Sequence, residues 1–390
     1  MPNKKTIAVI FGGRSAEHDV SIITAHIPII TALLGSGQYD VWSIYINKDG
    51  AWYCDQAMND LAFFRDPDYQ ANLKAKGTVR LDLNNGLTVV WPGLRQRSVK
   101  MDLVFPSMHG TYGEDGSLMG ILRMAGVPFV GCDMGASAVS MDKVYTKQIL
   151  HSQGLPIVPF VWFTKDEWQN NKEAILQKIK PLHYPLFVKP VHLGSSIGIS
   201  KVKDDATLVD AIEVAVHYDE KVLVEEGVES LIEVTLPIRG NEKLTLASVE
   251  HPLNKTEFFD FEDKYLSGGK GGKSGGVNNN YSEIPAKIAP ELMARVQDLG
   301  RQTYKTLGCT GISRVDFLIN GATNEIFVNE VNNLPGSLYE HNWRQSGVAS
   351  MELVLKLVEL AQERFAAQKQ ITYTFNSEVL KQVAGPKVQS

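Results

Sequence analysis

The chain has 390 residues with a formal net charge of −5, and 44% of them are hydrophobic, which predicts two or three folded domains and excludes a disordered chain. The acidic balance leaves no overall basic field, and we find no signal peptide and no apolar run near the roughly 20 residues that span a bilayer, so we expect neither nucleic acid nor a membrane as a partner. Three scattered cysteines, Cys54, Cys132 and Cys309, exclude a disulfide framework and a CxxC metal site, and they indicate a reducing, cytoplasmic setting.

The first third of the chain predicts an α/β unit. An apolar run at 6–11 ends at Gly12-Gly13, which is typical of a buried strand entering a tight turn. Helical apolar spacing follows at 16–34, and a second strand at 41–46 completes a βαβ opening. The G-x-G-x-x-G spacing of a dinucleotide site and the P-loop motif are both absent. Further predicted elements are weak strands at 79–83 and 88–91, strands at 103–106 and 128–130, and a helix at 118–125.

The middle of the chain predicts a helix over 136–153 and then a hairpin with strands at 184–190 and 199–202. Lys189 lies at the end of the first strand, beside the turn Gly194–Gly198. A lysine next to free backbone N–H groups suits a phosphate. The alternative is an ordinary hairpin whose lysine reaches solvent. Further predicted elements are a helix at 206–216 and strands at 221–226, 232–238 and 244–251.

The segment 267–280 contains six glycines and follows the aromatic run Phe258–Tyr265. Aromatic residues before a glycine tract suggest a lid that orders over a substrate, and the alternative is a disordered linker. Further predicted elements are a helix at 290–307, strands at 313–319 and 325–331 around an Asn-Gly turn, a helix at 351–368 and a polar tail from 372.

Four polar residues lie on the two strands of this last hairpin. Arg314 and Asp316 are two residues apart on one strand, and Glu330 and Asn332 on the other, so each pair shares a face. Carboxylate and amide oxygens suit Mg²⁺ that is also bound to phosphate. The alternative is a surface ion pair between Arg314 and Glu330.

Seven motifs in one order resemble those of the D-alanine–D-alanine ligases of the ATP-grasp superfamily. They are Gly12–Ser21, His109–Gly116, Ser140–Lys143, Phe187–Pro190 with Gly194–Ser196, Phe258–Tyr265, Gly311–Phe317 and Asn329–Gly336. The resemblance covers residues 6–361 and implies an α/β (α+β) ATP-grasp fold. Its parts are an N-terminal Rossmann-like substrate domain (1–133), a central domain (134–236) and a C-terminal domain (237–371, with a lid loop at 258–281) that grip ATP, and a tail (372–390).

The resemblance also implies a reaction. The carboxylate of one D-alanine attacks the γ-phosphate of ATP to form an acylphosphate, and the amine of a second D-alanine then attacks the acyl carbon. The dipeptide serves peptidoglycan synthesis. The substrates are small molecules, and the resemblance implies a homodimer.

Residue roles follow from the same resemblance. Lys143, Lys189, Lys264 and Ser196 match cofactor-binding positions, the lysines at phosphate. Glu225 and, after a one-residue insertion, Glu233 match the acids that hold adenine and ribose. Asp316, Glu330 and Asn332 match the ligands of two Mg²⁺ ions, with Mn²⁺ as a substitute. Arg314 and the N–H of Gly336 are expected to hold the reacting oxygens. Glu17 is expected to orient the first ammonium group and to form a hydrogen-bonded trio with Ser195 and Tyr265.

The stretch Ser337–Trp343 departs from the family pattern. The family has there a serine hydroxyl that holds the carboxylate of the acceptor, whereas His341 or Asn342 falls at that place here; the alternative is that this stretch is only a helix start. Tyr265 matches the dipeptide-forming pattern. Two further hypotheses are therefore kept: a D-alanine ligase with D-serine, D-lactate or another amino acid as acceptor, and a nucleotide-binding protein without catalysis.

Overall fold

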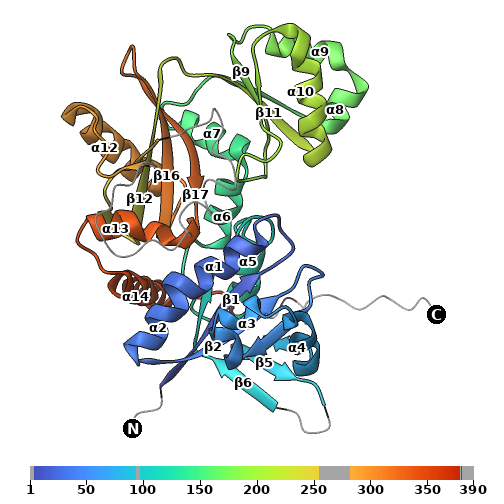
Figure 1. The fold of residues 1–390 in the computed structure, drawn as a ribbon, viewed down its shortest axis with the longest axis vertical. Helices are drawn as coiled ribbons and strands as arrows, with labels where there is room; N and C mark the ends of the chain where they lie inside the picture. Colours follow the sequence, from blue (N-terminus) through green and yellow to red (C-terminus); the bar gives the residue numbers. More distant parts are fainter. Residues whose placement is uncertain (1–3, 94–96, 254–281, 378, 380–390) are drawn as a thin grey trace.

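The structure is a computed structural model that describes residues 4–93, 97–253, 282–377 and 379. Three larger sheets belong to the N-terminal, central and C-terminal parts of the chain, and Figure 1 shows the central part standing apart from the other two. The predicted lid, with Lys264 and Tyr265, lies outside the described residues.

The N-terminal sheet is built on β1 (Lys5–Gly12), a strand whose apolar side chains from Ile7 to Phe11 are fully buried. It lies between two parallel neighbours, which confirms the predicted βαβ opening. A Cβ added at Gly12 would lie 2.2 Å from the carbonyl oxygen of Ile46, at a φ of +89°, so this turn requires glycine. The other strands are β2 (Tyr39–Ile46), β3 (Trp52–Asp55) and β7 (Leu103–Pro106).

The region between residues 50 and 130 is more regular than its sequence predicts. A small antiparallel sheet forms there, and its third strand was not predicted. The predicted strand at 128–130 is reduced to one parallel bridge between Val104 and Phe129. The elements are η2 (Gln56–Asn59), α3 (Ala62–Arg65), α4 (Tyr69–Lys76), β4 (Arg80–Asp82), β5 (Leu87–Trp91), β6 (Arg97–Met101) and α5 (Ser117–Ala125).

One helical stretch, His18–Ser36, is long and apolar enough to cross a membrane, with a mean hydropathy of 1.5. The prediction that no apolar run approaches the length of a membrane-spanning helix was wrong. In the fold, however, 61% of the apolar window is buried, and Ile29 and Leu33 pack in one core with β1 and the last helix. Composition and length alone do not reveal this burial. The stretch consists of α1 (His18–Thr24), the π-helical η1 (Ala25–Ile30), which contains Pro28, and α2 (Thr31–Ser36).

The helix predicted over 136–153 is two helices, α6 (Met134–Met141) and α7 (Lys143–Ser152). The break falls at Asp142, whose backbone is extended. Its carboxylate caps α7 by accepting hydrogen bonds from the N–H groups of Val144 and Tyr145, both at 2.8 Å. Both helices contribute to the core of the C-terminal sheet.

The central sheet is antiparallel, in the order β10-β9-β11-β8, and it has its own apolar core that includes Phe163 and Trp168. The predicted hairpin of β9 and β10 is confirmed. β8 and the two helices after it were not predicted. The elements are β8 (Phe160–Thr164), α8 (Lys165–Asn170), α9 (Lys172–Ile179), β9 (Leu186–Pro190), β10 (Ser200–Val202), α10 (Asp205–Tyr218) and β11 (Lys221–Glu226).

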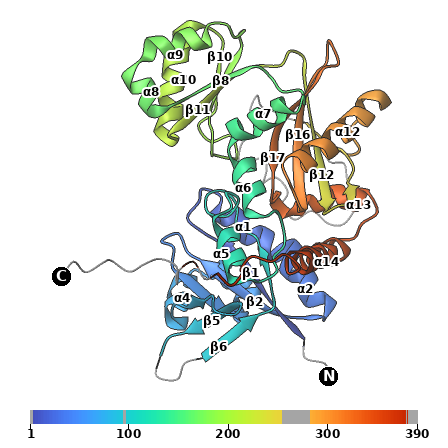
Figure 2. The ribbon, with the colours of Figure 1, turned by 180° about the vertical axis from the view of Figure 1, so that it is seen from behind.

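The C-terminal sheet has the order β13-β12-β16-β17. β12 (Leu231–Gly240) pairs with β16 (Gly311–Asn320) along its whole length, so it runs across the boundary predicted between residues 236 and 237; the domain limits themselves stay a prediction. The last helix, α14 (Ser350–Gln368), lies against α2 and joins this part to the N-terminal part (Figures 1 and 2). The remaining elements are β13 (Leu244–Leu246), β14 (His251–Pro252), β15 (Ser282–Glu283), α12 (Pro290–Thr306), β17 (Ile326–Asn332), η3 (Gly336–Tyr339) and α13 (Glu340–Gln345).

Candidate active site

A cavity of about 200 Å³ lies between the central and the C-terminal sheets. Its walls come from β9 and the turn after it on one side, and from β12, β16 and β17 on the other. Most of the predicted site residues that the structure describes line it. They are Lys143, Lys189, Ser195, Ser196, Glu233, Arg314, Asp316 and Glu330.

Two lysines share one buried carboxylate beside this cavity. Glu225 on β11 forms ion pairs with Lys189 on β9 and, at 2.7 Å, with Lys147 on α7. Burial opposes the charge of Glu225, but the two ammonium groups outweigh it and lower the pKa of the carboxyl to about 2. Burial lowers the pKa of Lys147. For Lys189 burial acts in the same direction, but attraction to Glu225 outweighs it and raises the pKa. Glu330 also attracts both lysines, and Glu233 attracts Lys189, so Glu225 is not their sole source of negative charge.

Sequence reasoning missed Lys147. The available signal was its spacing, four residues after Lys143 on the same helix face. Sequence reasoning also assigned Glu225 to adenine or ribose. In the structure its carboxylate binds two lysines instead, so the nucleotide role stays a prediction without support from these contacts.

The turn after β9 connects the cavity with the N-terminal part. Lys143 donates to the carbonyl oxygen of Leu193 at 2.7 Å, and its Nζ lies 3.9 Å from Oε2 of Glu330. The hydroxyl of Ser195 donates to Oε1 of Glu17 at 2.5 Å. Two members of the predicted trio are therefore in contact, and the third lies outside the described residues.

The hairpin of β16 and β17 brings the four predicted residues together as expected. Arg314 is opposite Asn332, and Asp316 is opposite Glu330. The guanidinium of Arg314 forms a two-pronged ion pair with Asp316 on its own strand, with Nε 2.6 Å from Oδ1. Burial opposes the charge of Arg314, but Asp316 outweighs it and raises the pKa, so the arginine stays charged. The guanidinium also lies 4.6 Å from the ring centre of Tyr339.

The predicted metal ligands fit Mg²⁺ by their chemistry. Asp316 and Glu330 present carboxylates from facing strand positions, and Asn332 adds an amide whose oxygen accepts from the N–H of Leu334 at 3.1 Å. In the part of the chain that the structure describes, no cluster of three or more His, Cys, Asp or Glu is placed to hold a metal. Two carboxylates and an amide match a Mg²⁺ ion that takes its other ligands from phosphate and water.

The stretch that departs from the family pattern lies near the cavity. Asn342 is fully buried and donates to the carbonyl oxygen of Ser248 at 2.9 Å, so it supports the fold. His341 bonds at 3.0 Å to Glu250, which lines the cavity. Of the two candidates for the place of the serine, His341 is therefore the one connected to the cavity. Gly336 opens η3, and the N–H of Ser337 beside it donates to Thr24 at 3.0 Å.

Comparison with known proteins identifies the family of the chain. The family model described as D-ala D-ala ligase C-terminus matches residues 149–359, and the one described as D-ala D-ala ligase N-terminus matches residues 6–132. The chain belongs to the D-alanine–D-alanine ligase family. The alignments with members of this ligase family span nearly the whole chain.

Two curated relatives are a D-alanine–D-alanine ligase of Acetivibrio thermocellus and D-alanine–D-alanine ligase A of Escherichia coli K12. The first is 35% identical and the alignment covers 94% of this chain and 98% of the relative. The second is also 35% identical, with 95% and 99% covered. Among solved structures, the VanG D-Ala:D-Ser ligase of Enterococcus faecalis has a TM-score of 0.74 at 33% identity, covering 92% of this chain and 100% of the other. The D-alanine–D-alanine ligase of Coxiella burnetii has a TM-score of 0.77 at 26% identity, covering 94% and 96%. These neighbours agree with the ATP-grasp fold.

Proposed function

We propose that this protein joins two D-alanines into D-alanyl-D-alanine at the expense of ATP, with Mg²⁺, in the cytoplasm and as a homodimer, to supply peptidoglycan synthesis. One observation carries the proposal beyond family membership. A single cavity combines Lys143 and Lys189 on one side with the carboxylates and the arginine of the facing hairpin. Phosphoryl transfer between carboxylate and ATP needs this combination.

The two steps use the two walls of the cavity. In the first step the carboxylate oxygen of one D-alanine bonds to the γ-phosphorus, and ADP leaves; Lys143, Lys189 and Lys264 hold the phosphate oxygens. Asp316, Glu330 and Asn332 would hold Mg²⁺, which neutralises phosphate charge when bound.

In the second step the amine of the other D-alanine bonds to the acyl carbon, phosphate leaves, and the nitrogen loses a proton. Arg314 and the N–H of Gly336 stabilise the oxygens on which negative charge develops. Glu17 holds the first ammonium group, and Ser195 and Tyr265 complete its hydrogen bonds.

The deciding experiment supplies Mg²⁺-ATP with D-alanine as the sole amino acid and identifies the products by mass spectrometry. We expect one ADP and one phosphate for each dipeptide of D-alanine. Nucleotide binding without turnover on any acceptor would instead leave a binding protein without catalysis.

A second candidate is ligation of D-alanine to another acceptor. The similarity to a D-Ala:D-Ser ligase and the position of His341 favour it. Turnover is therefore also compared with D-serine and D-lactate added to D-alanine. A mixed product formed at an equal or higher rate than the D-alanine dipeptide would replace the main proposal.

The metal assignment has its own test. Because Glu330→Gln removes a ligand charge, we expect turnover at low Mg²⁺ to fall at least about 100-fold, with partial recovery at high Mg²⁺. The control is Glu325→Gln on the same hairpin, an exposed residue that accepts from Thr323. Unchanged turnover of Glu330→Gln at low Mg²⁺ would contradict the assignment.

A further inference from the structure

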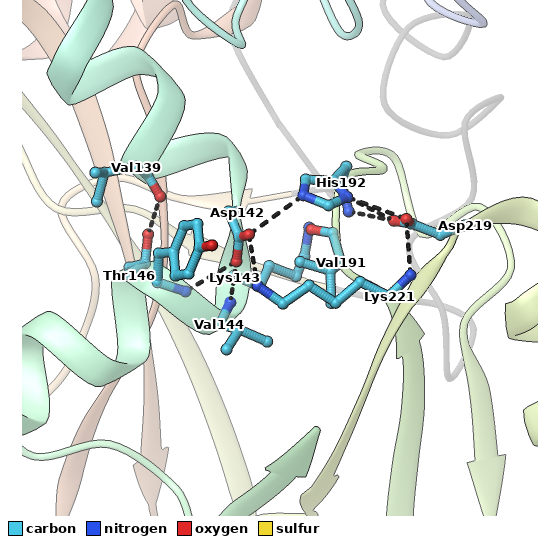
Figure 3. Close-up of polar contacts among 10 residues, drawn as sticks. Val139, Asp142, Lys143, Val144, Thr146, Val191, His192, Asp219 and Lys221 are labelled. Carbon is cyan, nitrogen blue, oxygen red and sulfur yellow. Dashed lines mark hydrogen bonds and ion pairs between the residues drawn. The ribbon is translucent and has the colours of Figure 1, made fainter. Parts of the chain in front are cut away.

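Asp142, His192, Asp219 and Lys221 form a network of charged side chains (Figure 3), and His192 lies three residues before Ser195 in the chain. The ring of His192 lies between two aspartates, with Nε2 3.2 Å from Oδ2 of Asp142 and Nδ1 3.0 Å from Oδ1 of Asp219. Lys221 completes the network by donating to the same Oδ2 of Asp142 at 2.7 Å.

The charges of this network balance each other. The side chains of Asp142 and Asp219 are only 5% and 6% exposed, so both carboxylates need cationic partners. Hydrogen bonds to Asp142 and Asp219 outweigh partial burial and raise the pKa of His192 to about 9. At neutral pH the two anions therefore face two cations, His192 and Lys221.

The network joins three elements to the start of the turn. Asp142 caps α7, the helix that carries Lys143 and Lys147, and Asp219 follows the end of α10. His192 is held twice by Asp219, through its ring and through its backbone N–H at 2.7 Å. The carbonyl of the next residue, Leu193, accepts from Lys143. The ring of His192 is therefore one of the anchors of the turn, beside the bonds of Leu193 to Lys143 and of Ser195 to Glu17.

We propose that His192 is a positioning residue for nucleotide binding: it fastens the turn after β9 to α7 and α10, and so fixes Lys143, Lys189 and the N–H groups of the turn around the ATP phosphates. This inference rests on the proposed function, since it presumes that the cavity binds ATP. His192 does not line the cavity, and it acts through the groups it holds.

The first test compares ADP affinity by calorimetry, without D-alanine, for the full chain and for His192→Gln at pH 7.5. We expect about fivefold weaker binding, with a similar rise in the KM for ATP and little change in kcat, because one partly exposed charged anchor is lost. The control is His183→Gln. His183 is a solvent-exposed histidine that pairs with Glu226 at 2.9 Å and does not line the cavity. Equal ADP affinities of wild type and His192→Gln at pH 7.5 would overturn the proposal.

The pH dependence separates the charge of His192 from a merely structural role. The groups that face His192 are Asp142 before α7 and Asp219 after α10, with Lys221 on β11 beside Asp142 and the ring centre of Tyr145 on α7 3.9 Å from Nζ of Lys221. As pH rises through about 9, wild type loses the proton of His192, so its ADP affinity should approach that of His192→Gln. The ratio of the ADP affinity of wild type to that of His192→Gln should therefore fall toward one by about pH 10. The ratio of the ADP affinity of wild type to that of His183→Gln should stay constant. A ratio that does not change with pH would contradict the role of the charge.

Stability gives an independent measure of the same charge. The pKa of His192 is above the ordinary 6.5, so its contribution to stability is fully present below about pH 6.5 and is lost as pH rises through 9. The difference in melting temperature between wild type and His192→Gln should shrink over that interval. If His192→Gln does not fold, His192→Asn, which keeps one donor without the charge, undergoes the same comparisons. Failure of dipeptide synthesis in wild type would reject the proposed function, while the ADP affinities would still decide on His192.

Discussion

Two groups of charged side chains meet helix α7, and they differ in their relation to the cavity. In the lysine group, Lys147 and Lys189 both pair with the carboxylate of Glu225, and Glu330 attracts both of them. In the aspartate group, Asp142 and Asp219 face His192 and Lys221, so the charges cancel. Buried charges need partners of opposite sign in both groups. The lysine group reaches the cavity through Lys189, whereas no member of the aspartate group lines it.

The largest effect is expected when the anion of the lysine group is removed. Glu225→Gln removes the carboxylate that both buried lysines contact, so we expect the free energy of unfolding at pH 7 to fall by about 3–5 kcal/mol, measured by urea denaturation. The matched control is Glu226→Gln, one residue along β11, whose carboxylate pairs with the exposed His183; a change below about 1 kcal/mol is expected there.

The same variant predicts a pH dependence with a definite sign. The pKa of Glu225 is lowered from 4.5 to about 2 in the fold, so its stabilisation is present above about pH 4.5 and is lost as pH falls toward 2. The stability difference between wild type and Glu225→Gln should therefore narrow in acid. A difference that stays constant from pH 5 to pH 3 would show that lost packing, and not lost charge, causes the effect.

A smaller effect is expected when a cation of the aspartate group is removed. Lys221→Met leaves two buried carboxylates with His192 as their single counter-charge, so we expect a loss of about 2 kcal/mol in the free energy of unfolding. Lys221 does not line the cavity, and the KM for ATP should change less than about twofold. A large rise in this KM without loss of stability would place Lys221 in the nucleotide site and break the distinction between the two groups.

The sequence predicted the hairpin of the C-terminal sheet well, because both of its signals are local. Alternation along the strands sets which side chains share a face, and the Asn-Gly turn sets where the chain reverses. The prediction that the hairpin brings the two pairs together is therefore confirmed, whereas the register of Asp316 opposite Glu330, which follows an irregularity between Asp316 and Phe317, was not predicted. The same reasoning predicted β9, β10 and the position of Lys189.

The charged groups around α7 could not be predicted in the same way, since their members come from distant parts of the chain. Helical periodicity runs through Asp142 without interruption, but its carboxylate bonds to Lys221, 79 residues away. The helix breaks where that carboxylate caps α7. Likewise, the spacing of Lys143 and Lys147 is visible in the sequence. The carboxylate that pairs with buried Lys147 belongs to Glu225 on β11, and helical spacing gives no sign of this contact.

The smallest expected effect is the counterpart of the Lys221 experiment. Lys147→Met removes one cation from the lysine group and leaves Lys189 as the partner of Glu225. Because burial lowers the pKa of Lys147, its charge is unfavourable in the fold, so we expect stability to change by less than about 1 kcal/mol. Glu225 then has Lys189 as its remaining lysine partner, which weakens the attraction of Lys189 for phosphate. We therefore expect the KM for ATP to rise about fivefold.

The two Lys→Met substitutions are thus expected to act on different quantities: Lys221→Met lowers stability, and Lys147→Met raises the KM for ATP. The surface control is Lys178→Met, an exposed lysine 3.7 Å from Glu167, which should change neither quantity. If Lys147→Met lowered stability as Lys221→Met does and left the KM for ATP unchanged, the charge of Lys147 would stabilise the fold and would not act on the nucleotide. The phosphate would then be bound by Lys143 and Lys189 without help from the buried lysine.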